Sequence, residues 1–317
     1  MHRILLIASC LAVSGAAQAE PTTLRIGYGG AAEEQLWLLI AKPAMGKHAG
    51  KDYTIEATRF SGSDSRAQAF EAGAIDLAEG GANGVIFAAA EGVSTKIIAS
   101  LARESTRGFS TAFYVKADSP IKTVADLKGK IVGINGFSTS GHLWLKGALE
   151  KVSLTDSDVT IARTSFPAMG ESLIAGRIDC GEFPQPFAAV LEHDAKVRKL
   201  FDAKYGLPFD EELNVLVGKD EFLKKHAGTI RAFLADLHDA TQFYLTEPRE
   251  ARQILIDAKM IRVNPEIYLS MVDWYRDPTM RPDLAALKKM QEFQVKAGFQ
   301  KKPVDIDSIV DTSYLPK

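Results

Sequence analysis

The sequence predicts an α/β protein built from two similar units, each with a mainly parallel sheet flanked by helices. Strand and helix patterns alternate from residue 24 to residue 101, and the alternation begins again at residue 110. Strands connected through helices form parallel sheets, because the chain returns to the same end of the sheet before each new strand. The 317 residues also exceed one ordinary hydrophobic core, which stops growing at roughly 250–300 residues.

The first unit opens with a strand whose apolar and polar residues alternate into a glycine break. Residues 61–64 (SGSD) supply turn and N-cap residues for a helix that Gly73 stops, and the glycine-rich loop 80–84 leads into another helix. The predicted strands cover residues 24–30, 53–60, 75–78 and 95–101, and the predicted helices cover residues 33–44, 66–72 and a segment ending at residue 90.

The second unit repeats this order, and a helical region follows it. Its predicted strands are 110–116, 130–134, 159–162, 178–181 and 213–217, and its predicted helices are 123–127, 142–152 and 169–175. From residue 221 onward the spacing of apolar residues is helical, with helices expected at 222–244, 250–258, 265–274 and 283–297.

The motif A-G-x-I-D occurs twice, at residues 72–76 and 175–179. Each copy lies where a predicted helix ends at glycine and the chain enters a short apolar strand. We expect Asp76 and Asp179 to cap or orient the starts of these strands, which favours a structural role over a binding role. The loops that follow the two strands are then the places to look for a ligand.

The N-terminal residues and the composition indicate the cellular compartment of the protein and the kind of partner to expect. Residues 1–19 have a positive start, an apolar run and an A-Q-A cleavage pattern, which predicts a signal peptide and a periplasmic protein. Cys10 lies in a lipobox-like context, so a lipid anchor is the less favoured alternative. Cleavage leaves Cys180 as the only cysteine, so no internal disulfide forms. The formal net charge is −2, and without a strongly basic stripe nucleic acid is not the expected partner.

Several segments make the chain resemble the periplasmic substrate-binding proteins of ABC importers, in the nitrate, sulfonate and taurine branch that also includes thiamine-precursor binding proteins. The most specific is S-P-I-K-x-x-x-D-L-K-G-K at residues 119–130, although it marks a broad superfamily of two-lobed proteins. The other segments are 24–28, 72–76, 80–83, 138–140, 175–179 and 186–187. Many relatives have an acidic residue or tryptophan before the Pro-Phe pair, where this chain has Gln185, and this leaves the ligand open.

The resemblance implies two lobes that close on a ligand in the cleft between them. We expect lobe 1 to comprise residues 20–108 and 218–317 and lobe 2 residues 109–217, with hinges near 108–110 and 213–218. The implied partners are a small organic anion, such as an alkanesulfonate or taurine, and the permease and ATPase subunits of an importer. We expect a monomer with no cofactor. An aromatic carboxylate or sulfonate, or a thiamine-precursor-like heterocycle, is the alternative ligand.

Candidate ligand-binding residues lie in the loops beyond the carboxyl ends of the predicted strands, where open α/β sheets bind ligands. The loop 136–142 (GFSTSGH) stands out, because a helix N-terminus favours an anion and three hydroxyls add donors. The alternative is an ordinary glycine turn in which Ser140 is the N-cap of the following helix. The two interpretations are compatible with each other. The candidates are Tyr28, Gly29, Gly30, Ser61, Ser63, Gly81, Asn83, Arg107, Phe137, Ser138, Thr139, Ser140, His142, Phe183 and Gln185.

Each further candidate has a structural alternative. Asn83 either binds ligand or holds its own turn. Arg107 is preferred over Arg66 and Arg103 for a two-point grip on an acid group, although most arginines are surface residues. His142 is assigned a neutral donor role, with plain exposure as the alternative. The rings of Tyr28, Phe137 and Phe183 would sandwich an apolar ligand body, or else belong to the core.

Enzymatic function is not expected. The sequence contains no H-E-x-x-H, C-x-x-C, G-x-S-x-G or P-loop motif, and its six histidines lack metal-ligand spacing. We therefore expect no catalytic or metal-binding residues. A thiamine-pyrimidine enzyme and an extracytoplasmic sensor module are the remaining, less favoured alternatives.

Overall fold

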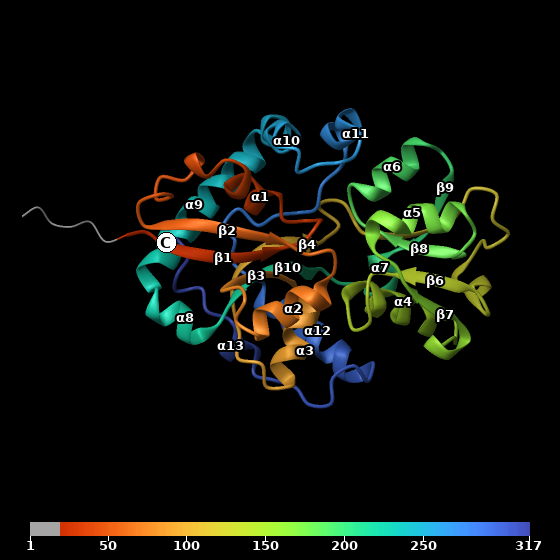
Figure 1. Cartoon of the computed structure of the whole chain (residues 1–317). Helices are drawn as coiled ribbons and strands as arrows, with labels where there is room; N and C mark the ends of the chain where they lie inside the picture. Colours follow the sequence, from red (N-terminus) through yellow and green to blue (C-terminus); the bar gives the residue numbers. More distant parts are fainter. Residues whose placement is uncertain (1–19) are drawn as a thin grey trace, which may run out of the picture.

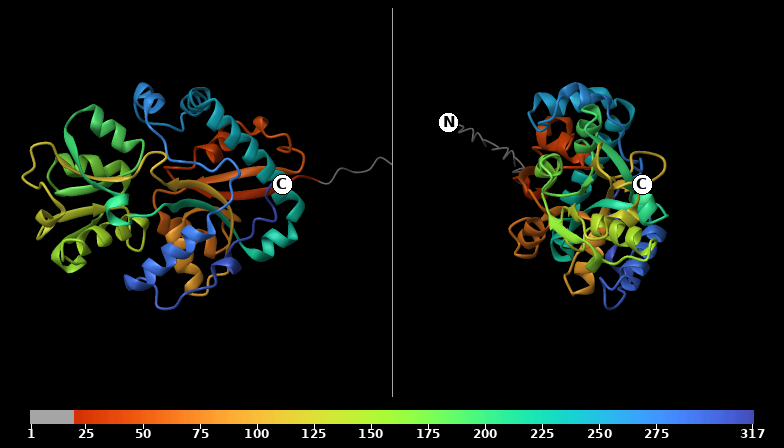
Figure 2. Two further views of the ribbon diagram at one scale, coloured as in Figure 1. Left: turned by 180° about the vertical axis from the view of Figure 1, so that it is seen from behind. Right: turned by 90° about the vertical axis from the view of Figure 1, so that its right-hand side faces the viewer.

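The computed structural model describes residues 20–317 and contains two α/β lobes side by side (Figure 1). The predicted signal peptide and Cys10 lie outside the described residues. Lobe 1 combines the N-terminal part of the chain with the C-terminal helices, and lobe 2 is built from the middle of the chain. The molecule is longer along the line joining the lobes than across it (Figure 2). The predicted two-lobed α/β fold is confirmed.

The sheet of lobe 1 has the strand order β2-β1-β3-β10-β4 and is covered by helices on both faces (Figure 1). Its strands are β1 (Thr22–Tyr28), β2 (Tyr53–Arg59), β3 (Leu77–Gly81), β4 (Lys96–Glu104) and β10 (Glu211–Gly218). Its helices are α1 (Glu34–Ala41), η1 (Pro43–Met45), α2 (Ser63–Glu71), α3 (Ala82–Ala90), α8 (Asp220–Lys225), α9 (Ala227–Thr246), α10 (Pro248–Asp257), α11 (Pro265–Ser270), α12 (Leu284–Lys296) and α13 (Ile306–Ile309).

The sheet of lobe 2 has the strand order β7-β6-β8-β5-β9. Side chains alternate along β5, so that Phe113 and Val115 join one buried cluster while Ala112 and Tyr114 join another on the opposite face. The strands are β5 (Ala112–Lys116), β6 (Ile131–Ile134), β7 (Thr160–Arg163), β8 (Cys180–Phe183) and β9 (Val197–Asp202). The helices are η2 (Val124–Leu127), α4 (Ser140–Glu150), η3 (Asp156–Asp158), α5 (Phe166–Ile174), α6 (Phe187–His193) and α7 (Ala203–Gly206).

Both sheets are mixed. β10 runs antiparallel to β3 and β4, and β5 runs antiparallel to β8 and β9, whereas the remaining pairs are parallel. β5 and β10 each follow a crossing from the other lobe, so each enters its sheet from the end that faces that lobe. The antiparallel strands are thus a consequence of the two crossings.

The lobes are joined by two crossings, at residues 105–111 and 207–210. Residues 213–218, predicted as the second hinge, lie inside β10 and pair with strands of lobe 1, so that prediction was wrong. β10 contains an apolar run like those of the other strands, so the sequence did not indicate where the crossing ends and the strand begins. From here on, lobe 1 means residues 20–104 and 211–317, and lobe 2 means residues 112–206.

The two A-G-x-I-D copies form the same structural joint. Gly73 and Gly176 have φ values of 74° and 71°, a region that glycine adopts without a steric cost. Asp76 accepts the backbone N–H of Arg25 within β1, at 3.1 Å, and Asp179 accepts that of Ile131 at the start of β6, at 2.8 Å. Each aspartate thus bonds to the strand beside the one that it precedes, β1 beside β3 and β6 beside β8, which is a structural contact, although not with the start of its own strand.

None of the helices among residues 20–317 is long and apolar enough to cross a bilayer.

Candidate ligand-binding cleft

A cleft of ≈ 970 Å³ lies between the lobes, at the carboxyl ends of β1, β3, β6 and β8. All of these strands run toward the opposite lobe, so the loops that follow them line the cleft, and the first turns of α2, α3 and α4 do as well. The lining contains more carboxyl groups than guanidinium groups. Its charged residues are Arg59, Asp64, Arg66, Glu71, Glu79, Glu91, Glu182 and Arg262.

Nine of the fifteen predicted site residues line this cleft. They come from both lobes, and in each case they occupy the loop after a strand or the first turn of the next helix. They are Gly29, Gly30, Ser61, Ser63, Gly81, Phe137, Ser138, Thr139 and Ser140. That these residues contact a ligand stays a prediction.

Phe183 and Gln185 are among the predicted residues that do not line the cleft. Phe183 is fully buried on the far face of its sheet, edge-on to Tyr114, because side chains alternate along β8 and its neighbour Glu182 takes the cleft side. Gln185 is buried and donates to the Val272 carbonyl at 3.1 Å, so it holds lobe 2 against the C-terminal part of lobe 1.

His142, Arg107 and Tyr28 are also absent from the cleft lining. The His142 ring is buried behind its loop, where Nδ1 accepts the Ser138 N–H at 3.2 Å and Nε2 contacts Asp156. Arg107 is exposed within the first crossing, with its guanidinium 3.5 Å from the ring centre of Tyr275. Tyr28 packs against the apolar residues of lobe 1 that surround α1.

Asn83 joins the lobes instead of lining the cleft. It is 1% exposed, and its Nδ2 donates to Ser140 Oγ of lobe 2 at 2.9 Å. Its Oδ1 accepts from Gln294 of α12 at 2.7 Å.

Other contacts between the lobes include the Gln185 bond described above and an exposed ion pair at 2.6 Å between Arg163 and Asp64. Trp144 of lobe 2 also donates to Glu211 of lobe 1 at 2.9 Å, and the rings of His142 and Phe299 meet edge-on with centres 4.6 Å apart. We refer to this arrangement, in which the two lobes touch, as closed.

The Asn83–Ser140 bond gives a testable prediction. Ser140→Ala removes the acceptor in the closed form only, so ligand affinity should fall by about two- to tenfold, the worth of one ordinary hydrogen bond. Isothermal titration calorimetry measures this change. Arg163→Gln removes the exposed ion pair and should weaken binding less, because exposed pairs contribute little. Equal effects of the two variants would contradict the assignment.

The wall of lobe 1 holds a buried group of charged residues, of which sequence analysis considered only Arg66. Arg66 donates to Glu79 Oε2 at 2.6 Å and to the Glu79 carbonyl at 2.7 Å, and both residues are buried. Glu33 Oε1 accepts the Gly29 N–H at 2.6 Å, whereas its Oε2 has no partner among the described residues. Burial raises the pKa of Glu33 well above its usual value, and the negative charge of Glu79 raises it further.

The wall of lobe 2 holds Glu182 at the end of β8. It is 4% exposed, lines the cleft, and its Oε2 accepts the Asn135 N–H at 3.2 Å. Burial raises the pKa of Glu182 to about 7, although the Asn135 hydrogen bond opposes the shift. Glu182 forms no ion pair with another residue of the described chain.

One part of the cleft is apolar. Trp37, Phe166 and Phe187 line it together with the segment 260–263 between α10 and α11. The rings of Phe166 and Phe187 are tilted at 31° with centres 6.1 Å apart. Trp37 is buried, and its Nε1 has no hydrogen-bond partner among the described residues. The cleft can therefore hold both a polar group and an apolar body.

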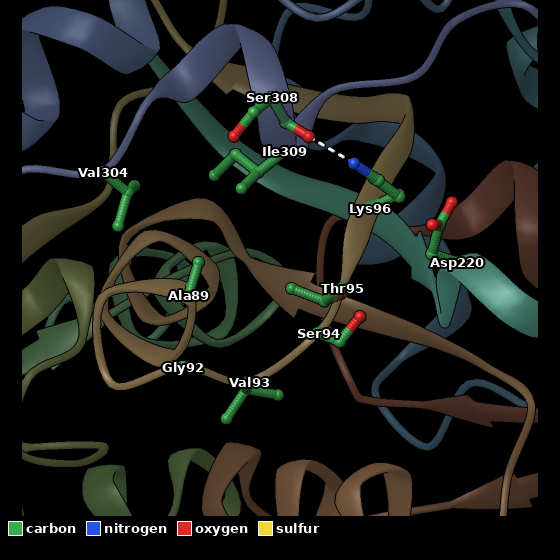
Figure 3. A pocket seen from close by; sticks show the side chains of 10 residues that line it. All are labelled: Ala89, Gly92, Val93, Ser94, Thr95, Lys96, Asp220, Val304, Ser308 and Ile309. Atoms are coloured by element: carbon green, nitrogen blue, oxygen red, sulfur yellow. Dashed lines mark hydrogen bonds between the residues drawn. The ribbon is translucent and has the colours of Figure 1, made fainter.

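A smaller hollow of ≈ 290 Å³ lies on lobe 1 (Figure 3). It is bounded by the segment 92–96, by Asp220 and by α13. Its charged residues already have partners, since Lys96 donates to the Ser308 carbonyl and Asp220 pairs with Lys224 at 2.7 Å. The Thr95 hydroxyl, which has no hydrogen-bond partner among the described residues, lines this hollow but lines the larger cleft as well.

Comparison with known proteins places this chain among binding proteins. The family model described as NMT1/THI5 like matches residues 48–251. The chain is 25% identical to the "Putative aliphatic sulfonates-binding protein" of Escherichia coli (strain K12), over 91% of this chain and 88% of that protein. It is 27% identical to the "Taurine-binding periplasmic protein" of the same organism, over 73% of this chain and 69% of that protein.

Solved structures share the fold. The alkanesulfonate-binding protein SsuA from Xanthomonas axonopodis pv. citri, bound to MOPS, superposes with a TM-score of 0.76 at 22% identity, over 92% of this chain and 99% of that one. The periplasmic aliphatic sulphonate binding protein SsuA from Escherichia coli superposes with a TM-score of 0.71 at 20% identity, over 92% of each chain.

Proposed function

The chain belongs to the NMT1/THI5-like family, and from this premise we propose that it is an extracytoplasmic solute-binding protein of an ABC importer. It captures a small organic molecule between its lobes and delivers it to a membrane permease powered by an ATPase subunit. The observation that carries this proposal is the ≈ 970 Å³ cleft, whose walls come from both lobes. A cleft between lobes joined by two crossings opens and closes by hinge bending, which couples binding to shape.

The proposed ligand is an alkanesulfonate of the taurine kind, as in the names of the two Escherichia coli relatives. Arg59 lines the cleft, is exposed, and forms no ion pair with another described residue. The first turn of α2 lines the same cleft, and the one carboxylate in that turn, Asp64, is paired with Arg163 of lobe 2. A guanidinium beside a helix N-terminus suits a sulfonate or carboxylate head.

An aromatic acid or a thiamine-precursor-like heterocycle is the second candidate. The observation that favours it is the number of aromatic residues in the lining: Trp37, Phe60, Phe70, Phe87, Phe137, Trp144, Phe166, Phe187 and Trp274. Aromatic walls bury a flat ligand body well. We assign no catalytic role to the chain, and we propose that it acts in the periplasm.

Thermal-shift measurements on residues 20–317 test the proposed function. The panel comprises alkanesulfonates, aromatic sulfonates and carboxylates, and aminopyrimidines. A ligand that binds only the native state adds about 2.7 kcal/mol of stability at a hundredfold excess over its dissociation constant, so the melting temperature must rise with concentration. A flat response to every compound would contradict the proposal. A response to aromatic compounds alone would select the second candidate.

A further inference from the structure

The repeated motif is longer than A-G-x-I-D. In both copies the third residue after the aspartate is glutamate, so the chain contains A-G-x-I-D-x-x-E at residues 72–79 and 175–182. The two joints are equivalent in the structure, and the strands that leave them, β3 and β8, both end at the cleft. Glu79 and Glu182 therefore occupy equivalent positions on opposite walls, and both side chains are at least 95% buried.

The two glutamates differ in what surrounds them. Glu79 is paired with the buried Arg66, which compensates its charge inside lobe 1. Glu182 has no cationic side chain beside it, and its single hydrogen bond uses Oε2. Its Oε1 accepts no hydrogen bond from any residue of the described chain. Glu182 is 4% exposed, and Oε1 is not among its fully buried atoms, so an oxygen without a partner lines the cleft where a ligand donor can reach it.

The first turn of α4 is built around the Glu182 carboxylate. A Cβ atom placed on Gly141 would overlap that carboxylate, with the farther oxygen at 2.6 Å. Glycine at this position thus lets the carboxylate approach the positive end of the α4 dipole. The predicted anion-binding loop 136–142 is consequently occupied by the protein's own carboxylate, and a ligand anion placed there would meet a like charge.

We propose that Glu182 binds a nitrogen-bearing, hydrogen-bond-donating group of the ligand, such as a protonated amine. This inference rests on the proposed function and sharpens it: the ligand carries an amino group as well as an acid head. The acid head faces Arg59 and the start of α2 in lobe 1, while the amine donates to Glu182 Oε1 in lobe 2. A ligand with both groups is held by both lobes and so favours closure.

Calorimetry with matched pairs of compounds tests this assignment. Taurine is compared with ethanesulfonate, and 3-aminopropanesulfonate with propanesulfonate, at pH 8. We expect the amino compound of each pair to bind at least about tenfold more tightly, since a charge-assisted hydrogen bond is stronger than a neutral one. Glu182→Gln should abolish that preference, so that the amino and amine-free members of each pair bind within about twofold of one another. Glu150→Gln, an exposed change in the same helix α4, should leave the preference intact.

A second variant moves the Glu182 carboxylate without replacing Glu182 itself. Gly141→Ala should displace Glu182 and reduce the amine preference as Glu182→Gln does, whereas Gly228→Ala, where a Cβ meets open space, should not. Circular dichroism and thermal melting verify that each variant is folded.

The outcomes separate the two proposals. If the amine-free sulfonates bind as tightly as the amino compounds, or if Glu182→Gln keeps the preference, the role of Glu182 is overturned while the binding function stands. If no compound of either kind binds, the proposed sulfonate-binding function fails. If propylamine binds without any acid group and Glu182→Gln abolishes its binding, the role of Glu182 stands and the anion assignment fails.

Discussion

Arg276→Met is expected to lower the free energy of unfolding by about 3–5 kcal/mol, the usual cost of removing one partner from a buried ion pair. The Arg276 guanidinium is 1% exposed and pairs with Glu34 and with Asp273, the latter at 2.8 Å. It also donates to Gln35 at 3.1 Å. Without it, the buried Glu34 loses its ion-pair partner and the half-buried Asp273 keeps only Arg252. The segment around Trp274 then also loses one of its attachments to lobe 1.

Urea unfolding monitored by circular dichroism measures this effect, and Arg249→Met is the matched control. Arg249 is exposed in α10, so its replacement should change stability by less than about 0.5 kcal/mol. If Arg276→Met were as mild as the control, the buried ion pairs would not hold the C-terminal segment, contrary to our account.

Glu211→Gln is expected to flatten the pH dependence of stability and to stabilise the protein at pH 8. Glu211 begins β10 directly after the second crossing, opposite Glu104, and both are buried. Its Oε1 accepts from Trp144 Nε1 at 2.9 Å, and its Oε2 has no partner among the described residues. The pKa of Glu211 is raised to about 8, chiefly by burial; the charge of Lys204 opposes the rise, and the charges of Glu104 and Asp210 contribute to it.

The sign of the effect follows from proton binding. In the folded chain Glu211 stays protonated up to about pH 8, whereas in the unfolded chain it ionises near pH 4.5. Between these values the native state holds more protons, so stability falls as pH rises, by up to about 1.4 kcal/mol per pH unit for this group. The contribution is complete below pH 4.5 and is lost as the pH passes 8.

Chemical unfolding from pH 5 to pH 8.5 checks this prediction. The wild-type curve should descend more steeply than that of Glu211→Gln, and the curves should differ most at the alkaline end. Glu150→Gln, which changes an exposed glutamate, should run parallel to the wild type. A Glu211→Gln curve parallel to the wild type would show that this carboxyl ionises normally in the fold.

Local patterns were sufficient to predict much of the fold. Apolar periodicity and glycine stops located β1, β2, α2 and the C-terminal helices, because these elements depend on near neighbours. Elements without a local signal were missed: α6 and β9 were not predicted, and the helix expected at 222–244 is divided at His226 into α8 and α9. The end of the second crossing was misplaced because β10 begins with Glu211 and Glu212, two charged residues that are typical of a loop in sequence but are buried in the structure.

The candidate site was predicted in position better than in chemistry. Loops at strand ends follow from topology, and therefore Gly29, Ser61 and Ser138 were placed in the cleft correctly. The chemistry depends on contacts between residues that are apart in sequence. Arg66 compensates the charge of Glu79, and Gly141 leaves room for the Glu182 carboxylate. The repeated motif A-G-x-I-D-x-x-E was the one signal in the sequence for the two glutamates. Only the structure shows that both of them line the cleft.

Small-angle X-ray scattering on residues 20–317, with and without a saturating ligand from the thermal-shift panel, tests the central claim most directly. We predict a smaller radius of gyration with ligand, because a molecule held by both lobes stabilises the closed arrangement bridged by Asn83 and Ser140. The decrease should be reduced in Ser140→Ala. An unchanged radius at proven saturation would contradict binding between the lobes.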